Sequence, residues 1–244
     1  MRIQVINPNT SQGMTDKIAT AAKAVALSNT TIIATQPQHG PSTVESAFDE
    51  IIASAALMDE IQTGIEHDVD AHIIACFGDP GLDAARELSS VPVIGIAEAA
   101  FHMASLITRR FSVVTTMSST LPTAHHLLDR YGFSQMCASV RATDIPVKEL
   151  ESMTSTLYSA LYHECLLAIN DDGAEAIVLG CAGMADLVAR LSSALNVPVI
   201  DGVAAAVKLA ESLDQLGLRT AKSGFYAAPK PKAFVGRYQH WSKE

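Results

Sequence analysis

The chain has few cysteines, few basic residues and no long apolar run, and each scarcity excludes a class of protein. Its four cysteines in 244 residues are too few for a disulfide scaffold, and they indicate a reducing, cytoplasmic environment. No apolar run approaches the ~20 residues of a membrane-spanning helix, and the first residues lack the pattern of a secretory signal. With 17 basic against 26 acidic residues, the net charge of −9 disfavours nucleic acid or an anionic membrane as a partner. A small-molecule ligand fits these limits.

Short motifs of several enzyme classes are also missing. The sequence contains no P-loop, GxGxxG, GxSxG, HExxH or CxxC pattern, so nucleotide binding, serine hydrolysis, zinc-peptidase chemistry and dithiol redox chemistry lack support. The adjacent pair His125 and His126 is a weak metal candidate, because neighbouring residues on a helix do not share a face. His72 and His102 are expected to be structural polar residues near the edge of the core.

Short β-branched stretches alternate with longer segments of helical period, which is the pattern of βα units around a parallel sheet. The predicted strands are Ile3–Ile6, Thr31–Ala34, Ala71–Ala75, Val91–Gly95, Phe111–Thr115, Ala138–Ala142, Ala176–Leu179 and Val197–Ile200. The predicted helices are Met14–Ala26, Val44–Thr63, Leu82–Leu88, Ala97–Ile107, Leu121–Tyr131, Glu149–Asn170, Met184–Leu195 and Val203–Gln215. The pattern predicts an α/β fold with two sets of four strands.

The two halves of the chain also resemble each other in sequence. Aligning residues 70–81 (DAHIIACFGDPG) with residues 175–186 (EAIVLGCAGMAD) brings Cys76 onto Cys181 and Gly78 onto Gly183, both at a separation of 105 (181 − 76 and 183 − 78). Each half then continues with a helix and a Val-Pro-Val strand. This internal duplication predicts two lobes and a C-terminal helix with a tail that packs back on the body. The expected boundaries are 1–96, 97–205 and 206–244.

The matched cysteines suggest a two-base reaction. Ligands of an open parallel sheet bind at the carboxyl ends of its strands, and Cys76 and Cys181 each follow a strand and precede a Gly-containing turn. If the halves face each other, one sulfur removes a proton next to a carbonyl and the other returns one from the opposite face. A helix start favours a nearby anion by ~0.3–2 kcal/mol, so we expect it to lower each thiol pKa by roughly one unit.

A single cysteine at a strand end is more simply a buried structural residue, and Cys137 and Cys165 keep that interpretation because neither has a matched partner. Backbone N–H groups of the turns, with those of the polar tips 7–11 and 115–119, would hold the charge of an enolate. The segment 40–46 (GPSTVES) is either a turn with Ser42 or Thr43 as helix cap or a lip of the cleft.

Four segments carry a resemblance to a known family: VINPNTS (5–11), IIACFGDPGLDAARE (73–87), VVTTMSSTLP (113–122) and IVLGCAGMADL (177–187). They resemble the hydantoin racemases, including allantoin racemases, of the aspartate/glutamate/hydantoin racemase superfamily, and the resemblance covers Met1–Leu213. It implies two pseudo-symmetric lobes, each a parallel four-stranded sheet flanked by helices, with the active site between them. It also implies no cofactor, no metal and a homo-oligomer.

The resemblance maps the family's catalytic cysteines onto Cys76 and Cys181, its substrate-binding asparagine onto Asn7 and its polar mid-chain tip onto Thr115 and Thr116. With these residues and their neighbours in the motifs, the predicted substrate contacts are Asn7, Pro8, Thr43, Phe77, Gly78, Thr115, Thr116, Gly180, Ala182 and Gly183.

The resemblance predicts a cofactor-independent racemase acting at C5 of 5-substituted hydantoins, or an allantoin racemase. An aspartate/glutamate-type amino-acid racemase is a further alternative, disfavoured because the strand tips lack the Arg or Lys that a side-chain carboxylate would need. A thiol-dependent amidohydrolase and a non-catalytic binding protein with a two-lobed cleft also remain open, because fold alone does not decide function.

Overall fold

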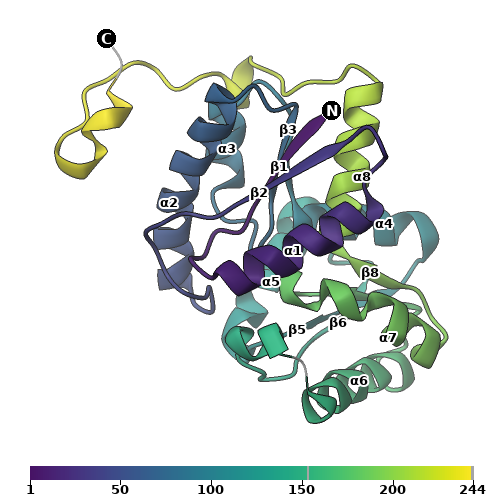
Figure 1. Ribbon diagram of the computed structural model, residues 1–244. Helices are drawn as coiled ribbons and strands as arrows, with labels where there is room; N and C mark the ends of the chain where they lie inside the picture. The colour runs from purple at the N-terminus through teal and green to yellow at the C-terminus, as the bar shows by residue number, and fades with distance from the viewer. Residues whose placement is uncertain (153, 243–244) are drawn as a thin grey trace.

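The computed structural model describes residues 1–152 and 154–242, which form two α/β lobes lying against each other (Figure 1). Residue 153 of the predicted helix 149–170 and residues 243 and 244 of the predicted tail lie outside the described residues. The first lobe contains β1 (Arg2–Ile6), α1 (Gln12–Val25), β2 (Thr31–Thr35), α2 (Ala47–Glu66), β3 (Ala71–Ile74), α3 (Leu82–Leu88) and β4 (Val93–Gly95). The second contains α4 (Ile96–Ile107), β5 (Phe111–Thr115), α5 (Leu121–Tyr131), β6 (Cys137–Ala142), α6 (Ser155–Asn170), β7 (Ala176–Leu179), α7 (Val188–Leu195) and β8 (Val199–Asp201), and α8 (Gly202–Gln215) follows.

Each lobe is built on a parallel sheet of four strands. The strand orders are β2-β1-β3-β4 and β6-β5-β7-β8, so the second sheet repeats the topology of the first. At the centre of each sheet, β-branched residues pair across strands and are fully buried, as in Val5 opposite Ile73 and Val113 opposite Val178. Such strands need cover on both faces, which the flanking helices provide. The predicted α/β class with two four-stranded parallel sheets is confirmed.

The lobes exchange helices. α4 leaves the first sheet and packs against β7 and β8 of the second, whereas α8 leaves the second sheet and packs against β3 and β4 of the first. The two helices also pack on each other, and a Cβ added at Gly202 would lie only 2.4 Å from the carbonyl oxygen of Ile96. This close contact fixes the strand ends of one lobe relative to those of the other.

The helix predicted at 44–63 is observed three residues later, as α2, and two other predicted helices begin in 3-10 segments. Residues 149–170 form a 3-10 segment at Val147–Ser152 and then α6, whose cap Thr154 accepts a hydrogen bond from the Leu157 N–H. Residues 184–195 likewise begin in a 3-10 segment, Ala182–Leu187, before α7. Apolar residues continue through both junctions, so their period does not reveal the change of helix type, which depends on local capping.

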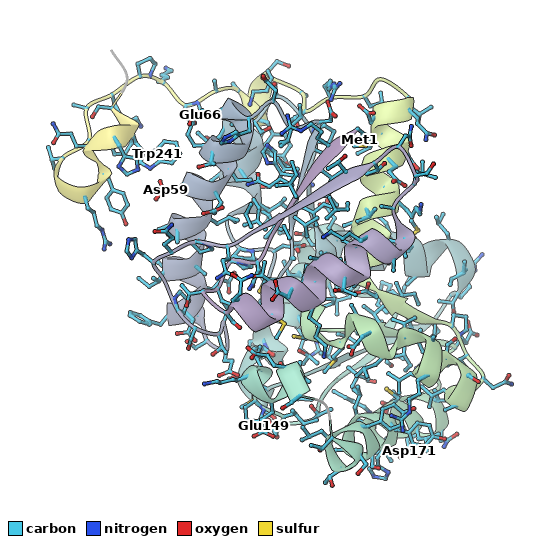
Figure 2. All side chains as sticks on the ribbon, viewed as in Figure 1. Met1, Asp59, Glu66, Glu149, Asp171 and Trp241 are labelled. Carbon is cyan, nitrogen blue, oxygen red and sulfur yellow. The ribbon has the colours of Figure 1, made fainter. Side chains whose placement is uncertain are left out.

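The chain after α8 runs back along the first lobe. The Thr220 N–H donates to the Ser90 carbonyl, and Lys222 Nζ donates to carbonyl oxygens at the end of α3. Figure 2 shows Trp241 beside α2, near Asp59, whose carboxylate pairs with the neighbouring His240 at 2.9 Å. Within residues 1–152 and 154–242, no helix has the length and apolar character needed to cross a bilayer.

Candidate active site

A cavity lies between the lobes, where the carboxyl ends of β1, β3, β5 and β7 meet. The volume open to the centre of a water-sized molecule is about 70 Å³. A cavity must offer at least ~10–15 Å³ to hold one water, and this one is well above that threshold. A small ring compound fits that space, and a polymer does not.

Cys76 and Cys181 line this cavity from opposite lobes. Cys76 follows β3 and Cys181 follows β7, and both side chains are partly accessible. The backbone N–H groups of Gly78 and Gly183 hydrogen-bond to the two sulfurs, each from two residues further along. Cys165 is buried in α6, outside the cavity. The fold thus brings together the two cysteines that the duplication paired.

The predicted lowering of the two thiol pKa values is wrong in sign. Burial raises the pKa of Cys76 to about 12 and that of Cys181 to about 11. The Gly78 and Gly183 amides act in the opposite direction but do not offset the loss of hydration. The turn 77–81 separates Cys76 from α3, and a helix dipole acts only within its first turn. Both cysteines are therefore neutral thiols at pH 7.

The two thiols have different electrostatic surroundings. Burial and the hydrogen bond from the Gly78 N–H have the largest effects on the pKa of Cys76. Cys181 and the carboxylates of Glu50 and Asp79 raise this pKa further. At Cys181 the positive charge of Lys17 lowers the pKa, whereas the carboxylates of Glu45 and Asp201 raise it. Lys17 Nζ also donates to the carbonyl oxygen of Gly183, so α1 of the first lobe holds the turn of the second-lobe cysteine.

Of the predicted substrate contacts, most line the cavity and two do not. The lining residues are Asn7, Phe77, Gly78, Thr115, Thr116, Gly180, Ala182 and Gly183. Pro8 is buried but does not line the cavity. Thr43 does not line it either, whereas its neighbours Val44 and Ser46 do. Ser46, rather than Ser42 or Thr43, caps α2 by accepting the Asp49 N–H at 3.2 Å. The segment 40–46 is consequently both a helix cap and a lip of the cavity.

Asn7 is committed to the loop that it begins. Its Nδ2 donates to Asn9 Oδ1 at 2.8 Å and to Thr15 Oγ1 at 3.0 Å, and its Oδ1 accepts the Asn9 N–H. Asn9 Oδ1 accepts a second bond, from the Ser11 N–H. Among the residues that the structure describes, Asn9 Nδ2 has no acceptor, and Asn9 lines the cavity. Asn9 is therefore better placed than Asn7 to donate to a ligand.

The ends of β5 and β7 approach each other closely beside the cavity. Thr115 Oγ1 donates to the Gly180 carbonyl at 3.0 Å, and a Cβ at Gly180 would lie 2.9 Å from the Thr115 Cα. Only glycine fits this contact. Thr116 is 3% exposed and lines the cavity, and its hydroxyl makes no hydrogen bond within residues 1–152 and 154–242. It is a second free donor.

Residues 3–210 match the family described as Asp/Glu/Hydantoin racemase. The chain belongs to this family. It is 43% identical over 243 residues to the hydantoin racemase of Pseudomonas sp. (strain NS671), with 100% of this chain and 98% of that relative covered.

Solved structures agree with this placement. The allantoin racemase from Klebsiella pneumoniae superposes with a TM-score of 0.97 at 52% identity, over 99% of each chain. Glutamate racemase from Francisella tularensis subsp. tularensis SCHU S4 shares the fold, with a TM-score of 0.64 at 20% identity over 91% of this chain and 84% of that one. The chain is an isomerase of the racemase type, and the expected family resemblance is confirmed.

Sequence reasoning missed part of the wall of this racemase-family cavity. The missed lining residues are Asn9, Met14, Val44, Ser46, Glu50, Ala75, Ser119, Thr120, Thr123, Ala124 and Val147. Six of them lie within segments quoted in the sequence analysis but were not named there as substrate contacts: Asn9, Val44, Ser46, Ala75, Ser119 and Thr120. The other five come from α1, α2, α5 and a 3-10 segment, where no motif marks them. Among the described residues, Glu50 is the one charged side chain that lines the cavity, and burial raises its pKa while His126 opposes that shift. No three His, Cys, Asp or Glu side chains in the described chain gather as metal ligands would.

Proposed function

We propose that the chain racemises 5-substituted hydantoins, allantoin included, by a two-cysteine mechanism at C5. The observation that carries this proposal is the placement of Cys76 and Cys181 on one small cavity, each reaching it from a different lobe. C5 can then lose its proton on one face, and the planar carbanion that results can gain a proton on the opposite face. The names of the relatives, a hydantoin racemase and an allantoin racemase, support the substrate class.

The mechanism needs one thiolate and one thiol at the same time. The thiolate takes the C5 proton, and the electrons of the C5–H bond move toward the adjacent carbonyl, whose oxygen becomes negative. The other thiol then gives its proton to the opposite face of C5, so the pair ends with its proton on the other sulfur. Reaction in the reverse direction starts from that state. The pair carries one proton before and after the transfer. Because both cysteines are neutral thiols in the free protein at pH 7, one of them first loses its proton to water to give the one-thiolate state.

A raised thiol pKa makes the thiolate a stronger base but leaves a smaller fraction of it at pH 7. A thiolate held by few hydrogen bonds in a site with little water is a strong base, and burial makes each thiolate so. The Gly78 and Gly183 N–H groups stabilise whichever sulfur is ionised. Asn9 Nδ2 and the Thr116 hydroxyl are donors for the enolate oxygen, since hydrogen bonds aimed at developing charge stabilise it most.

Charge favours a neutral hydantoin over an acidic amino acid. In the described part of the chain, no lysine or arginine lines the cavity, whereas Glu50 does. A substrate with a side-chain carboxylate would be desolvated there without a cationic partner and next to a carboxyl group. A hydantoin ring carries amide groups that neutral donors and acceptors satisfy.

Four free cysteines support a cytoplasmic location, which we propose together with a homo-oligomeric assembly. Exposed apolar side chains on α2 and α4, including Phe48, Ile51, Leu106 and Ile107, supply surface for contact between copies. Light scattering on the purified protein measures the assembly.

Incubation of one enantiomer of a 5-substituted hydantoin in D2O tests the activity. We expect loss of circular dichroism, one deuterium at C5 of the inverted product, and an intact ring. Ring opening would instead support a thiol-dependent amidohydrolase, and binding of the hydantoin without turnover would support a non-catalytic binding protein. Inversion without solvent deuterium would refute the proposal. A reaction without enzyme corrects for spontaneous racemisation, and allantoin run in parallel ranks the substituents.

A further inference from the structure

The duplicated lobes differ in how the helix after the fourth strand is capped. In the second lobe, β8 ends at Asp201, whose carboxylate accepts the N–H groups of Val203 at 3.0 Å and Ala204 at 2.8 Å. These are the second and third residues of α8. In the first lobe the corresponding strand ends at Gly95, which has no side chain to cap α4.

Asp79 supplies the missing cap from a different part of the chain. Its carboxylate accepts the N–H groups of Ala97 at 3.0 Å and Glu98 at 2.9 Å, again the second and third residues of the helix. A Cβ at Gly95 would lie 2.2 Å from the Asp79 Cγ, so the glycine provides the space that this carboxylate occupies. The residue matching Asp79 in the second lobe is Met184 (184 − 79 = 105).

The hydrogen bonds of Asp79 link the turn after Cys76 to helices of the second lobe. Asp79 lies three residues after Cys76, and its N–H donates to the Cys76 carbonyl at 3.0 Å. Besides α4, its carboxylate accepts the hydroxyl of Tyr131, at the end of α5, at 2.9 Å. Both helices belong to the second lobe. Met184 makes the same backbone bond to Cys181 but has no carboxylate to reach another element.

We propose that Asp79 is a positioning residue for Cys76 alone: by capping α4 across the lobe boundary, it holds the Cys76 turn at the place where its sulfur faces Cys181. This inference rests on the proposed two-cysteine function. Glycine at position 95 is its necessary partner, since any side chain there would expel the carboxylate. The Cys181 turn is held differently, by Lys17 of α1.

Three variants separate positioning from stability. Asp79→Asn keeps the shape of the side chain but replaces one accepting oxygen by an NH2 group, which cannot accept the N–H of Ala97 or Glu98. The double variant Asp79→Met with Gly95→Asp copies the second-lobe arrangement, so it restores a cap on α4 without the tie to the Cys76 turn. Asp201→Asn is the matched control, because it weakens an equivalent cap that no cysteine turn shares.

The readout is the rate of iodoacetamide alkylation at each cysteine, followed by peptide mass spectrometry from pH 7 to 10, with urea unfolding in parallel. We expect both Asp79 variants to raise the alkylation rate of Cys76 by about tenfold or more, because loosening the turn exposes the sulfur and the removed carboxylate no longer raises its pKa. The rate at Cys181 should stay within about twofold. Asp201→Asn should leave Cys76 unchanged. Unchanged Cys76 rates, or equal changes at both cysteines, would overturn the inference.

Hydrogen exchange at C5 adds a functional readout. In a Cys181→Ser background only Cys76 can exchange the C5 proton with D2O, and we expect Asp79→Asn to slow that exchange by about tenfold or more. In a Cys76→Ser background the Asp79→Asn change should have no effect. Exchange lost equally in both backgrounds would also overturn the inference. If the unaltered protein exchanges no proton at all, the proposed function fails, while the alkylation result still decides the role of Asp79.

Discussion

Thiol reactivity in the free enzyme gives a quantitative prediction. Burial raises the pKa of Cys76 to about 12 and of Cys181 to about 11, from an ordinary value of 9.0. The thiolate fraction at pH 7 is therefore lower than that of an ordinary cysteine by about 1000-fold for Cys76 (12 − 9.0 = 3 units) and about 100-fold for Cys181 (11 − 9.0 = 2 units). Because iodoacetamide reacts with the thiolate, alkylation should be slower than that of an ordinary cysteine, by a smaller factor than the loss of thiolate because a more basic thiolate is also a stronger nucleophile.

Peptide mass spectrometry against N-acetylcysteine in the same tube measures these rates. We expect both rates to rise about tenfold per pH unit up to pH 10, without a plateau. Cys137 is the internal control, because burial raises its pKa to about 11 as well but it lies outside the cavity. A bound hydantoin should protect Cys76 and Cys181 and leave Cys137 reactive. Either cavity cysteine reacting as fast as N-acetylcysteine at pH 7 would refute the reasoning.

Two further predictions concern stability. Gly180→Ala places a Cβ 2.9 Å from the Thr115 Cα and should lower the free energy of unfolding, measured in urea, by about 1–3 kcal/mol. Gly78→Ala is the control, because the nearest atom to its Cβ would be 3.7 Å away. An equal loss of stability in both variants would contradict the close contact at Gly180. Burial lowers the pKa of His72 from 6.5 to about 4, so on acidification the unfolded chain binds this proton before the folded chain does. The free energy of unfolding should therefore fall as the pH drops from 6.5 to about 4, by about 3 kcal/mol in total (2.5 units × 1.36). His72→Asn should flatten this part of the pH dependence; an unchanged slope would exclude His72 as its source.

The sheets were predictable because their strands are buried on both faces. Runs such as Phe111–Thr115 and Ala176–Leu179 are short, apolar and β-branched, and the structure places strands at those residues. The cysteine pair was predictable from the internal duplication. Residues that follow equivalent strands lie at the carboxyl end of their own sheet, and these two ends face one cavity. The 3-10 segments at Val147–Ser152 and Ala182–Leu187 escaped prediction because the apolar pattern does not change there.

The details of the cavity depended on three-dimensional contacts that the sequence does not contain. Asn9 rather than Asn7 has the free amide, because hydrogen bonds within the loop decide which of the two is satisfied. Glu50 reaches the cavity only through the packing of α2 over the rim. The sign of the thiol pKa shifts was wrong because a sequence shows a nearby helix start but not the depth of burial.

The central claim is that Cys76 and Cys181 serve opposite faces of one carbon. The direct measurement is C5 deuterium exchange of each separate enantiomer, followed by NMR in D2O, with Cys76→Ser and Cys181→Ser. Both variants should lose racemisation, and each should exchange the proton of one enantiomer only, a different one for each variant. Exchange of the same enantiomer by both variants, or full racemisation by either, would contradict the account.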